Sequence, residues 1–273
     1  MLHCGKYQFK LDRPLVMGIV NVTPDSFSDG GRFFSPAKAI DHAYELIAEG
    51  ADILDIGGES TRPGAASVGV REELDRVLPL VEALRGVPVS IDTWKPEVMR
   101  AALTAGACMV NDVNALLAEG ALDAVAQSDA AVCLMHKQGD PQTMQKRPHY
   151  QDALTEVSEF LRERIAAAEA VGIARERIAI DPGFGFGKTL AHNLELLRGL
   201  QKLRELGVPV LAGLSRKSML GAITGQDVEH RVSASVAAAL IAVQRGASIV
   251  RVHDVRATVD ALKVWDAVNN CAK

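Results

Sequence analysis

The chain has 273 residues, of which 48% are hydrophobic and 23% are charged, and these proportions are typical of a globular protein rather than a disordered one. Its 30 basic and 34 acidic side chains give a net charge of −4, which excludes a generally basic nucleic-acid-binding protein. Only 4% of the residues are aromatic, so aliphatic side chains have to form the core. This length suits two domains of average size or one eight-stranded α/β barrel.

Neither a membrane span nor a secretion signal is predicted. No apolar run reaches the ~18 residues of a membrane span, and residues 1–14 hold no apolar segment. The four cysteines share no CxxC spacing, and two of them lie inside apolar runs. We therefore expect reduced, buried thiols, a cytoplasmic location, and no membrane or nucleic-acid partner.

A glycine followed by a short β-branched run recurs along the chain, at Gly50, Gly86, Gly106, Gly207 and Gly246. Glycine tolerates the left-handed conformation that ends many helices, and the run after it is typical of a buried parallel strand. Three further runs have no glycine close before them. Together these patterns predict eight strands, over residues 15–21, 51–56, 87–92, 107–112, 131–135, 177–181, 208–212 and 247–252.

Helical periodicity fills the intervals between these strands. Ser35 and Pro36 are a typical N-cap and first helical residue. The helix that follows is predicted to bury one face, made of Ile40, Ala43, Tyr44 and Ile47. The longest helix is predicted to end at Gly172 and to bury Leu154, Val157, Leu161, Ile165 and Ala168. Another helix is predicted along Leu194, Leu197, Leu200 and Leu203.

Strands that alternate with helices predict parallel strands joined by right-handed crossovers. Eight such units in 273 residues average about 34 residues each, the size of one unit in a (β/α)₈ TIM barrel. A doubly wound open sheet is the alternative. No linker or low-complexity tract interrupts the pattern, so we expect a single domain over residues 1–273 with the barrel proper over about 15–270.

Polar side chains stand at every predicted strand end. In a barrel these ends meet at one mouth, where active sites of this architecture lie. For any one residue a hydrogen-bonded strand terminus is an equally good interpretation, but the whole set indicates a site. Its members are Asn21, Asp55, Glu59, Asp92, Asn111, Asp112, His136, Asp181, Ser215, Arg216, Lys217, Arg251 and His253.

The composition of this set indicates two kinds of ligand group. Asp92, Asn111 and Asp181 offer carboxylate and amide groups that suit the amidine-like edge of a flat heterocycle, with Lys217 as a donor. A second, cationic set predicts an anionic group on the same ligand, because the arginine fork matches phosphate oxygens. This set consists of Arg62, Arg216, Arg251 and His253.

Two loops after the first and second strands are predicted to cover a ligand. Residues 22–34 and 57–64 are rich in Gly, Pro, Ser and Asp, and the first loop is long for its position. The run DPGFGFGKT at 181–189 fails the P-loop pattern because Pro182 stands where a glycine is needed, and it fails the dinucleotide pattern too. No zinc spacing is present, whereas Mg²⁺ remains compatible, with Asn21 as one oxygen ligand.

Seven motifs resemble those of the dihydropteroate synthases, a family of pterin-binding barrels, and they run in family order over nearly the whole chain. They are NVTPDSFSDGG at 21–31, ESTRPG at 59–64, SIDT at 90–93, NDV at 111–113, DPGFGFGK at 181–188, SRKS at 215–218 and RVHDV at 251–255. The resemblance implies a transferase of folate biosynthesis. It would join 6-hydroxymethyl-7,8-dihydropterin pyrophosphate to 4-aminobenzoate and give 7,8-dihydropteroate and pyrophosphate.

The resemblance also implies a role for each matched residue. The pterin side would consist of Asp92, Asn111, Met135, Asp181, Phe186 and Lys217. The pyrophosphate side would consist of Asn21, Thr61, Arg251 and His253, with Mg²⁺ between Asn21 and the leaving group. The 4-aminobenzoate side, where sulfonamides compete in this family, would consist of Phe27, Thr61, Arg62, Pro63 and Ser218. The catalytic residues would be Asp25, Arg62, Asp92 and Lys217.

We expect pyrophosphate to leave first and the arylamine to attack the resulting cation, with pyrophosphate needed before 4-aminobenzoate binds well. A pterin-binding relative without turnover and a folate–corrinoid methyltransferase are the alternatives, and Schiff-base chemistry at Lys217 is a weaker one. Lys137 stands where the family often carries methionine, which adds a cation near the mouth. The family commonly forms homodimers, and the alanine-rich helices near 232–245 and 256–268 could supply the interface.

Overall fold

Eight parallel strands form one closed barrel in a computed structural model that describes residues 1–23, 35–60, 67–139 and 143–269. The strands are β3 (Leu15–Asn21), β4 (Ile53–Gly57), β5 (Val89–Asp92), β6 (Met109–Asp112), β7 (Ala131–Met135), β8 (Ile178–Asp181), β9 (Leu211–Ala212) and β10 (Ile249–Val252). Their order is β8-β7-β6-β5-β4-β3-β10-β9, and a parallel bridge between Ile180 and Val210 joins the two ends. The barrel is confirmed and the open sheet is wrong, because such a sheet leaves its edges unpaired.

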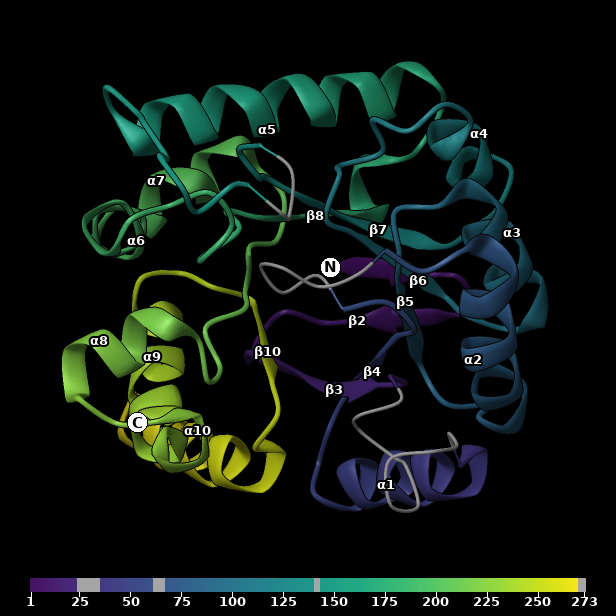
Figure 1. The fold of residues 1–273 in the computed structure, drawn as a ribbon, viewed down its shortest axis with the longest axis horizontal. Helices are drawn as coiled ribbons and strands as arrows, with labels where there is room; N and C mark the ends of the chain where they lie inside the picture. Colours follow the sequence, from purple (N-terminus) through teal and green to yellow (C-terminus); the bar gives the residue numbers. More distant parts are fainter. Residues whose placement is uncertain (24–34, 61–66, 140–142, 270–273) are drawn as a thin grey trace.

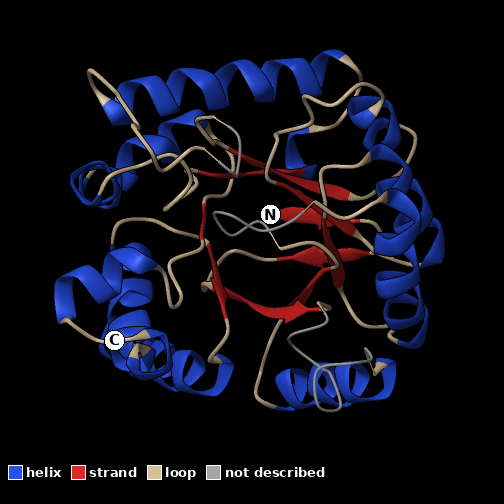
Figure 2. Cartoon of the chain, viewed as in Figure 1, coloured by secondary structure: helices blue, strands red, loops and turns tan. Residues whose placement is uncertain are grey.

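Helices surround the barrel, as Figure 2 shows by its blue ring around the red strands. Their bounds are α1 (Pro36–Ala48), α2 (Val70–Ala83), α3 (Pro96–Ala105), α4 (Ala121–Ala126), α5 (Ala153–Ala170), α6 (Leu190–Arg198), α7 (Leu200–Leu203), α8 (Ser218–Thr224), α9 (Val232–Gln244) and α10 (Val255–Asn269). Short 3₁₀ turns lie at Arg175–Arg177, Arg204–Leu206 and Val228–His230. Among the described residues, no helix combines the length and the apolar character that crossing a bilayer requires.

Alternation along each strand divides the apolar side chains into two clusters. On β4, Leu54 and Ile56 point outward and pack with the helices, while Ile53 points into the barrel. The inward cluster fills the amino-terminal half of the barrel. The outward cluster holds the helices on the strands, which is the two-sided burial expected of a parallel sheet.

A two-stranded hairpin that the sequence analysis missed closes the amino-terminal end of the barrel. Strands β1 (Leu2–Cys4) and β2 (Tyr7–Phe9) are antiparallel, and Figure 1 draws them across the centre of the ring. Leu2 and Cys4 are fully buried in the inward cluster. The hairpin therefore forms the floor of the barrel interior.

The predicted helix ends are confirmed, since all five glycines of the recurring pattern have positive φ angles between 75° and 126°. The predicted face of α1 is partly wrong. Ala39, Ala43 and Leu46 are its buried residues, whereas Tyr44 is 50% exposed. Small alanines let α1 approach the strands closely, and the bulky tyrosine lies at the edge of that contact.

The helix predicted along Leu194 to Leu203 is two helices, α6 and α7, which meet at Gly199. A Cβ atom at Gly199 would lie 2.3 Å from a methyl group of Leu154, so α5 packs directly against this backbone. The buried stripe of α5 is confirmed as predicted. Cys4, Cys108 and Cys133 are free and buried, as expected, and Cys271 lies outside the described residues.

Candidate functional site

Four polar side chains from β4, β5, β6 and β10 form one network inside the carboxyl-terminal, or upper, half of the barrel. The guanidinium of Arg251 on β10 donates to Asp55 on β4 over 2.5 Å and to Asp92 on β5 over 2.6 Å. The amide of Asn111 on β6 donates to the same oxygen of Asp55 over 2.9 Å. Because its nitrogen is committed to Asp55, Asn111 presents its carbonyl oxygen as the remaining acceptor.

Burial controls the ionisation of this network. It raises the pKa of Asp92 to about 7, although the nearby charge of Arg251 opposes the rise. Burial alone would lower the pKa of Arg251, but the carboxylates of Asp55 and Asp92 raise it above its usual value. Arg251 is therefore charged, and Asp92 is poised to gain or lose a proton near neutral pH.

The second part of the site joins β8 to the turn after β9. Asp181 accepts a hydrogen bond from the backbone of Gly183 over 2.7 Å. A Cβ atom at Gly213 would lie 3.7 Å from the carboxylate of Asp181 and 3.9 Å from the ammonium nitrogen of Lys217. Both charged groups thus face the same small space, which the absence of a side chain at Gly213 leaves open.

Lys217 is held by the loop that follows β8. Its ammonium donates to the carbonyl of Phe184 and lies 4.7 Å from the ring centroid of Phe186. Burial lowers the pKa of Lys217 to about 8, and the charge of Asp181 opposes this shift. Burial raises the pKa of Asp181 against the opposing charge of Lys217. Burial disfavours the charged form of both side chains. The carboxylate of Asp181 and the ammonium of Lys217 therefore stabilise one another.

The turn at residues 215–218 is held by side chains from α9 and the end of β10. Arg216 has a φ of 58°, its backbone amide donates to Ser235, and its guanidinium pairs with both oxygens of Asp254 at 3.0 and 2.5 Å. Its place in the cationic phosphate set therefore stays a prediction, and in this structure Asp254 occupies its fork. His253 contacts the hydroxyl of Ser215 through Nδ1 at 3.1 Å.

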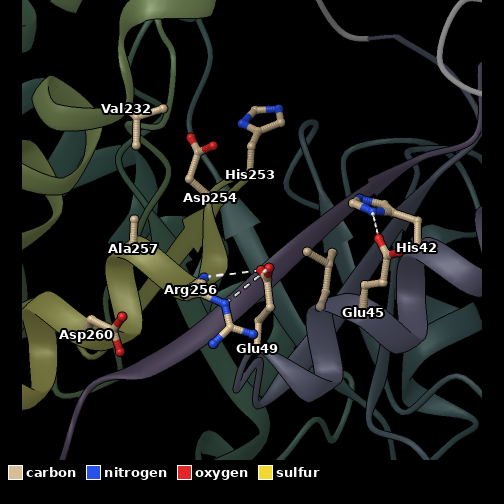
Figure 3. A pocket seen from close by; sticks show the side chains of 10 residues that line it. His42, Glu45, Glu49, Val232, His253, Asp254, Arg256, Ala257 and Asp260 are labelled. Atoms are coloured by element: carbon tan, nitrogen blue, oxygen red, sulfur yellow. Dashed lines mark hydrogen bonds and ion pairs between the residues drawn. The ribbon is translucent and has the colours of Figure 1, made fainter.

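A groove adjoins His253 on the outer side of the barrel, between α1 and the start of α10. Figure 3 shows Glu49, directly after α1, facing Arg256 at 3.7 Å between charged atoms, and His42 beside Glu45 at 3.5 Å. These basic groups are paired with acids of the same groove, so it adds no separate anion-binding group to the site.

The structure brings together most of the predicted site residues that it describes. Met135 ends β7 beside Asp181, its Cα partner on β8, and Phe186 is half-buried above Lys217. Asn21 ends β3, and Ser218 is exposed at the start of α8. Asp25, Phe27, Thr61, Arg62 and Pro63 lie outside the described residues.

Two of the polar side chains that were predicted to line the mouth do not face it. Asp112 accepts from the backbone amides of Asn114 and Leu116, both at 2.7 Å, and thus caps the turn after β6. The ring of His136 packs edge-on against Phe160 of α5, 4.9 Å between centroids. Residues one position further along a strand point to the opposite side of the sheet, which is why neither one joins Asn111 or Met135 inside the barrel.

A magnesium ion fits the donor set only with help from a substrate. Within the described residues, no group of three or more His, Cys, Asp or Glu side chains could hold a metal. Asn21 offers one half-buried amide oxygen at the mouth. Mg²⁺ commonly uses one or two protein oxygens together with substrate phosphates and water, so this single donor is compatible with it.

Sequence reasoning missed Lys188 and underrated Asp55. Asp55 is fully buried and accepts from both Arg251 and Asn111, although the sequence showed it only as one polar strand end among many. Lys188 belongs both to the failed nucleotide pattern and to the DPGFGFGK motif of the resemblance, and neither gives it a role of its own. Its burial depends on packing against the end of β7, which no local pattern in the sequence encodes.

Comparison with known proteins gives matches over nearly the whole chain. A family model described as pterin binding enzyme matches residues 17–253. The dihydropteroate synthase of Escherichia coli (strain K12) is 51% identical over 260 residues, which cover 94% of this chain and 92% of that protein.

Solved structures of such enzymes superpose closely on this barrel. The Xanthomonas albilineans dihydropteroate synthase with 4-aminobenzoic acid has a TM-score of 0.90 and 60% identity, over 95% of this chain and 94% of that one. The Burkholderia cenocepacia dihydropteroate synthase complexed with 7,8-dihydropteroate has a TM-score of 0.91 and 54% identity, over 99% and 96%. Together with the family model, these matches show that the chain belongs to the dihydropteroate synthase family of pterin-binding enzymes.

Proposed function

We propose that this chain joins 6-hydroxymethyl-7,8-dihydropterin pyrophosphate to 4-aminobenzoate and releases 7,8-dihydropteroate and pyrophosphate, the reaction of its family in folate biosynthesis. The observation that carries the proposal is the convergence of Asp181 and Lys217 on the space beside Gly213. A buried carboxylate and the ammonium of a half-buried lysine that face one space suit a flat ring with donors on one edge and acceptors on another.

The pterin binds deepest in the barrel. Asp181 accepts from its 2-amino group and N3, and Lys217 donates to O4 and N5. The carbonyl oxygen of Asn111 is the acceptor left over by its bond to Asp55. Phe186 and Met135 contact the faces of the ring, and Asp92 lies toward the reacting methylene.

The pyrophosphate binds nearer the mouth, against Asn21, Thr61, Arg251 and His253. Arg251 is held by two carboxylates, which fixes its position and leaves the guanidinium Nη1 to the leaving group. Asn21 would hold Mg²⁺ together with phosphate oxygens, and the ion supplies positive charge that stabilises pyrophosphate as it departs.

Breakage of the methylene carbon–oxygen bond sends the electron pair to pyrophosphate and leaves a cation shared with the pterin ring. Asp92 and Asp25 stabilise this cation by their negative charge. The amine of 4-aminobenzoate then forms the carbon–nitrogen bond and gives up one proton. Its carboxylate and ring are held by Phe27, Thr61, Arg62, Pro63 and Ser218, which assemble after pyrophosphate has bound.

Pyrophosphate release tests the proposal directly. The protein is incubated with dihydropterin pyrophosphate, 4-aminobenzoate and Mg²⁺, and release is followed with time. Lys217→Ala and Asp181→Ala are expected to weaken pterin binding, whereas Arg62→Ala is expected to lower turnover or 4-aminobenzoate binding. Absence of release under all conditions would favour a pterin-binding relative without turnover, and methyl transfer from a folate would favour the methyltransferase.

A homodimer in the cytoplasm is the expected working form. On α9 and α10, Ile241 is 41% exposed, Val264 66% and Val268 74%, and such apolar side chains suit an interface between copies. The free cysteines Cys4, Cys108 and Cys133 suit a reducing compartment. Light scattering of the wild type and Val264→Glu measures the oligomeric state, and a monomeric wild type would contradict the dimer.

A further inference from the structure

Lys188 is a buried lysine whose ammonium group contacts uncharged acceptors. It is 3% exposed, and among the described residues it makes no ion pair, since the charge of Asp181 reaches it only at longer range. Its nitrogen lies 3.0 Å from the carbonyl of Phe186, 3.0 Å from Nδ1 of His136 and 3.5 Å from the carbonyl of His136. Three acceptors match the three donors of an ammonium group.

His136 is built to accept rather than donate at this contact. Burial, followed by the charge of Lys188, lowers the pKa of His136 to about 3, so its ring is neutral. Burial lowers the pKa of Lys188 to about 7. Its ammonium form has no acceptor, so in that form Nδ1 of His136 receives the hydrogen bond. Phe160 and Tyr150 contact the ring at centroid distances of 4.9 and 6.1 Å and fix its orientation.

The segment held by this pair is the loop of residues 182–188, which supports the pterin site. Tyr150 donates to the carbonyl of Gly187 over 2.9 Å, beside the bond from Lys188 to Phe186. A Cβ atom at Gly183 would lie 1.8 Å from the carbonyl oxygen of His136, so the loop lies directly on the end of β7. The same loop carries the carbonyl of Phe184, to which Lys217 donates.

We propose that Lys188 and His136 form a positioning pair, which fixes the loop after β8 so that Lys217 and the ring of Phe186 stand at their places in the pterin site. This inference rests on the proposed function, and it assigns a task to two residues that touch no substrate. A buried charge without a counter-ion lowers stability, and methionine fills similar volume without that cost. Stability and pterin binding should therefore move in different directions when the charge is removed.

Lys188→Met tests this separation. We expect the calorimetric Kd for 6-hydroxymethyl-7,8-dihydropterin pyrophosphate to rise about tenfold, because the loop loses a charge-assisted hydrogen bond. The melting temperature should stay equal or rise. The KM for 4-aminobenzoate, measured at saturating dihydropterin pyrophosphate, should stay within about twofold of the wild type. Lys202→Met on α7, an exposed position, makes the same chemical change and should alter none of these values.

Two substitutions of His136 separate its acceptor from its ring. His136→Asn keeps an acceptor near Nδ1 and loses the ring, so its melting temperature should fall while its pterin Kd stays near the wild-type value. His136→Phe keeps a ring and loses the acceptor, so its Kd should rise as in Lys188→Met.

The inference is overturned if Lys188→Met binds the pterin ester as the wild type does, or if its Kd rises only together with a fall in melting temperature. Because the Kd needs no turnover, a wild type that binds the ester but releases no pyrophosphate would refute the proposed function alone.

Discussion

The lower and upper halves of the barrel interior are built from the same strands and differ completely in chemistry. On β4, Ile53 belongs to the apolar cluster and Asp55 to the polar network, and on β10 the same holds for Ile249 and Arg251. Two residues along a strand span only about 7 Å. Within that distance the interior changes from hydrocarbon to paired charges.

The two halves also carry opposite free-energy contributions. The lower half buries aliphatic side chains together with the hairpin and so stabilises the fold. In the upper half the raised pKa values of Asp92 and Asp181 and the lowered pKa of Lys217 show that the charged forms are disfavoured there. The upper half is therefore organised for a ligand at the expense of stability.

The largest effect is expected from neutralising the upper half at Asp181. Asp181→Asn keeps an acceptor for the backbone of Gly183 but loses the charge that the pterin edge needs. Two charge-assisted hydrogen bonds are affected, so the pterin Kd should rise about a thousandfold. Calorimetry measures the Kd. Thermal unfolding should show a modest fall in melting temperature, because Lys217 loses the opposing charge of Asp181. A large loss of stability would mean that the upper half also supports the fold.

The next effect concerns the lower half. Ile53→Ala leaves a cavity at a fully buried position and should lower the free energy of unfolding by about 3 kcal/mol. Denaturant titration measures this loss. The pterin Kd of the folded variant should change less than about twofold. A clear change in Kd would show that the two halves are coupled.

The pH dependence of the upper half gives a third, smaller effect. Asp92 acts as a carboxylate, so kcat/KM should rise with pH as this group loses its proton near its pKa of about 7. Lys217 acts as an ammonium, so kcat/KM should fall as pH passes its pKa of about 8. The expected result is a bell, with about a tenfold change per pH unit outside it. Lys217→Arg should move the falling limb to higher pH, and a flat profile from pH 6 to 9 would contradict both assignments.

The smallest effect lies at the boundary between the halves. Ser90 and Asp55 are Cα partners on neighbouring strands, and each has a fully buried oxygen without a hydrogen-bond partner among the described residues. Ser90→Ala removes one such atom and should raise the free energy of unfolding by about 1 kcal/mol. Cys133→Ser makes the opposite change in the apolar cluster and should lower it. Denaturant titration measures the free energy of unfolding of both variants. If Ser90→Ala is destabilised, the hydroxyl of Ser90 has a hydrogen-bond partner and the prediction is wrong.

The strands and helix ends could be predicted because their signals are local. Gly50 and Gly106 carry positive φ angles that other residues avoid, and the β-branched runs after them need no distant partner. The face of α1 could not be predicted as well, because the small Ala39 is buried against the strands whereas the bulky Tyr44 stays half exposed. Alternating apolar residues at Leu2, Cys4, Tyr7 and Phe9 are only a weak signal for a hairpin. The hairpin is stabilised by burial against the barrel interior, which the local sequence does not show.

The residues of the candidate site could be predicted from the sequence, but the hydrogen bonds and ion pairs among them could not. Strand-end positions indicated that Asp92, Asn111 and Asp181 would face the mouth. The pairing of Arg251 with Asp55 joins residues 196 positions apart and depends on barrel closure. Arg216 illustrates the same limit, because its pairing with Asp254 joins residues 38 positions apart in the sequence.

The hairpin of β1 and β2 gives the barrel a blind end. With Leu2 and Cys4 sealing that end, a molecule that reaches Asp181 arrives from the side of the mouth and departs by the same route. The pterin substrate, which binds deepest, then has to bind first. The product has to leave through the part of the mouth where 4-aminobenzoate was bound. The order in which ligands enter and leave the enzyme would thus be set by the eight residues from Leu2 to Phe9, at the opposite end of the molecule from the chemistry.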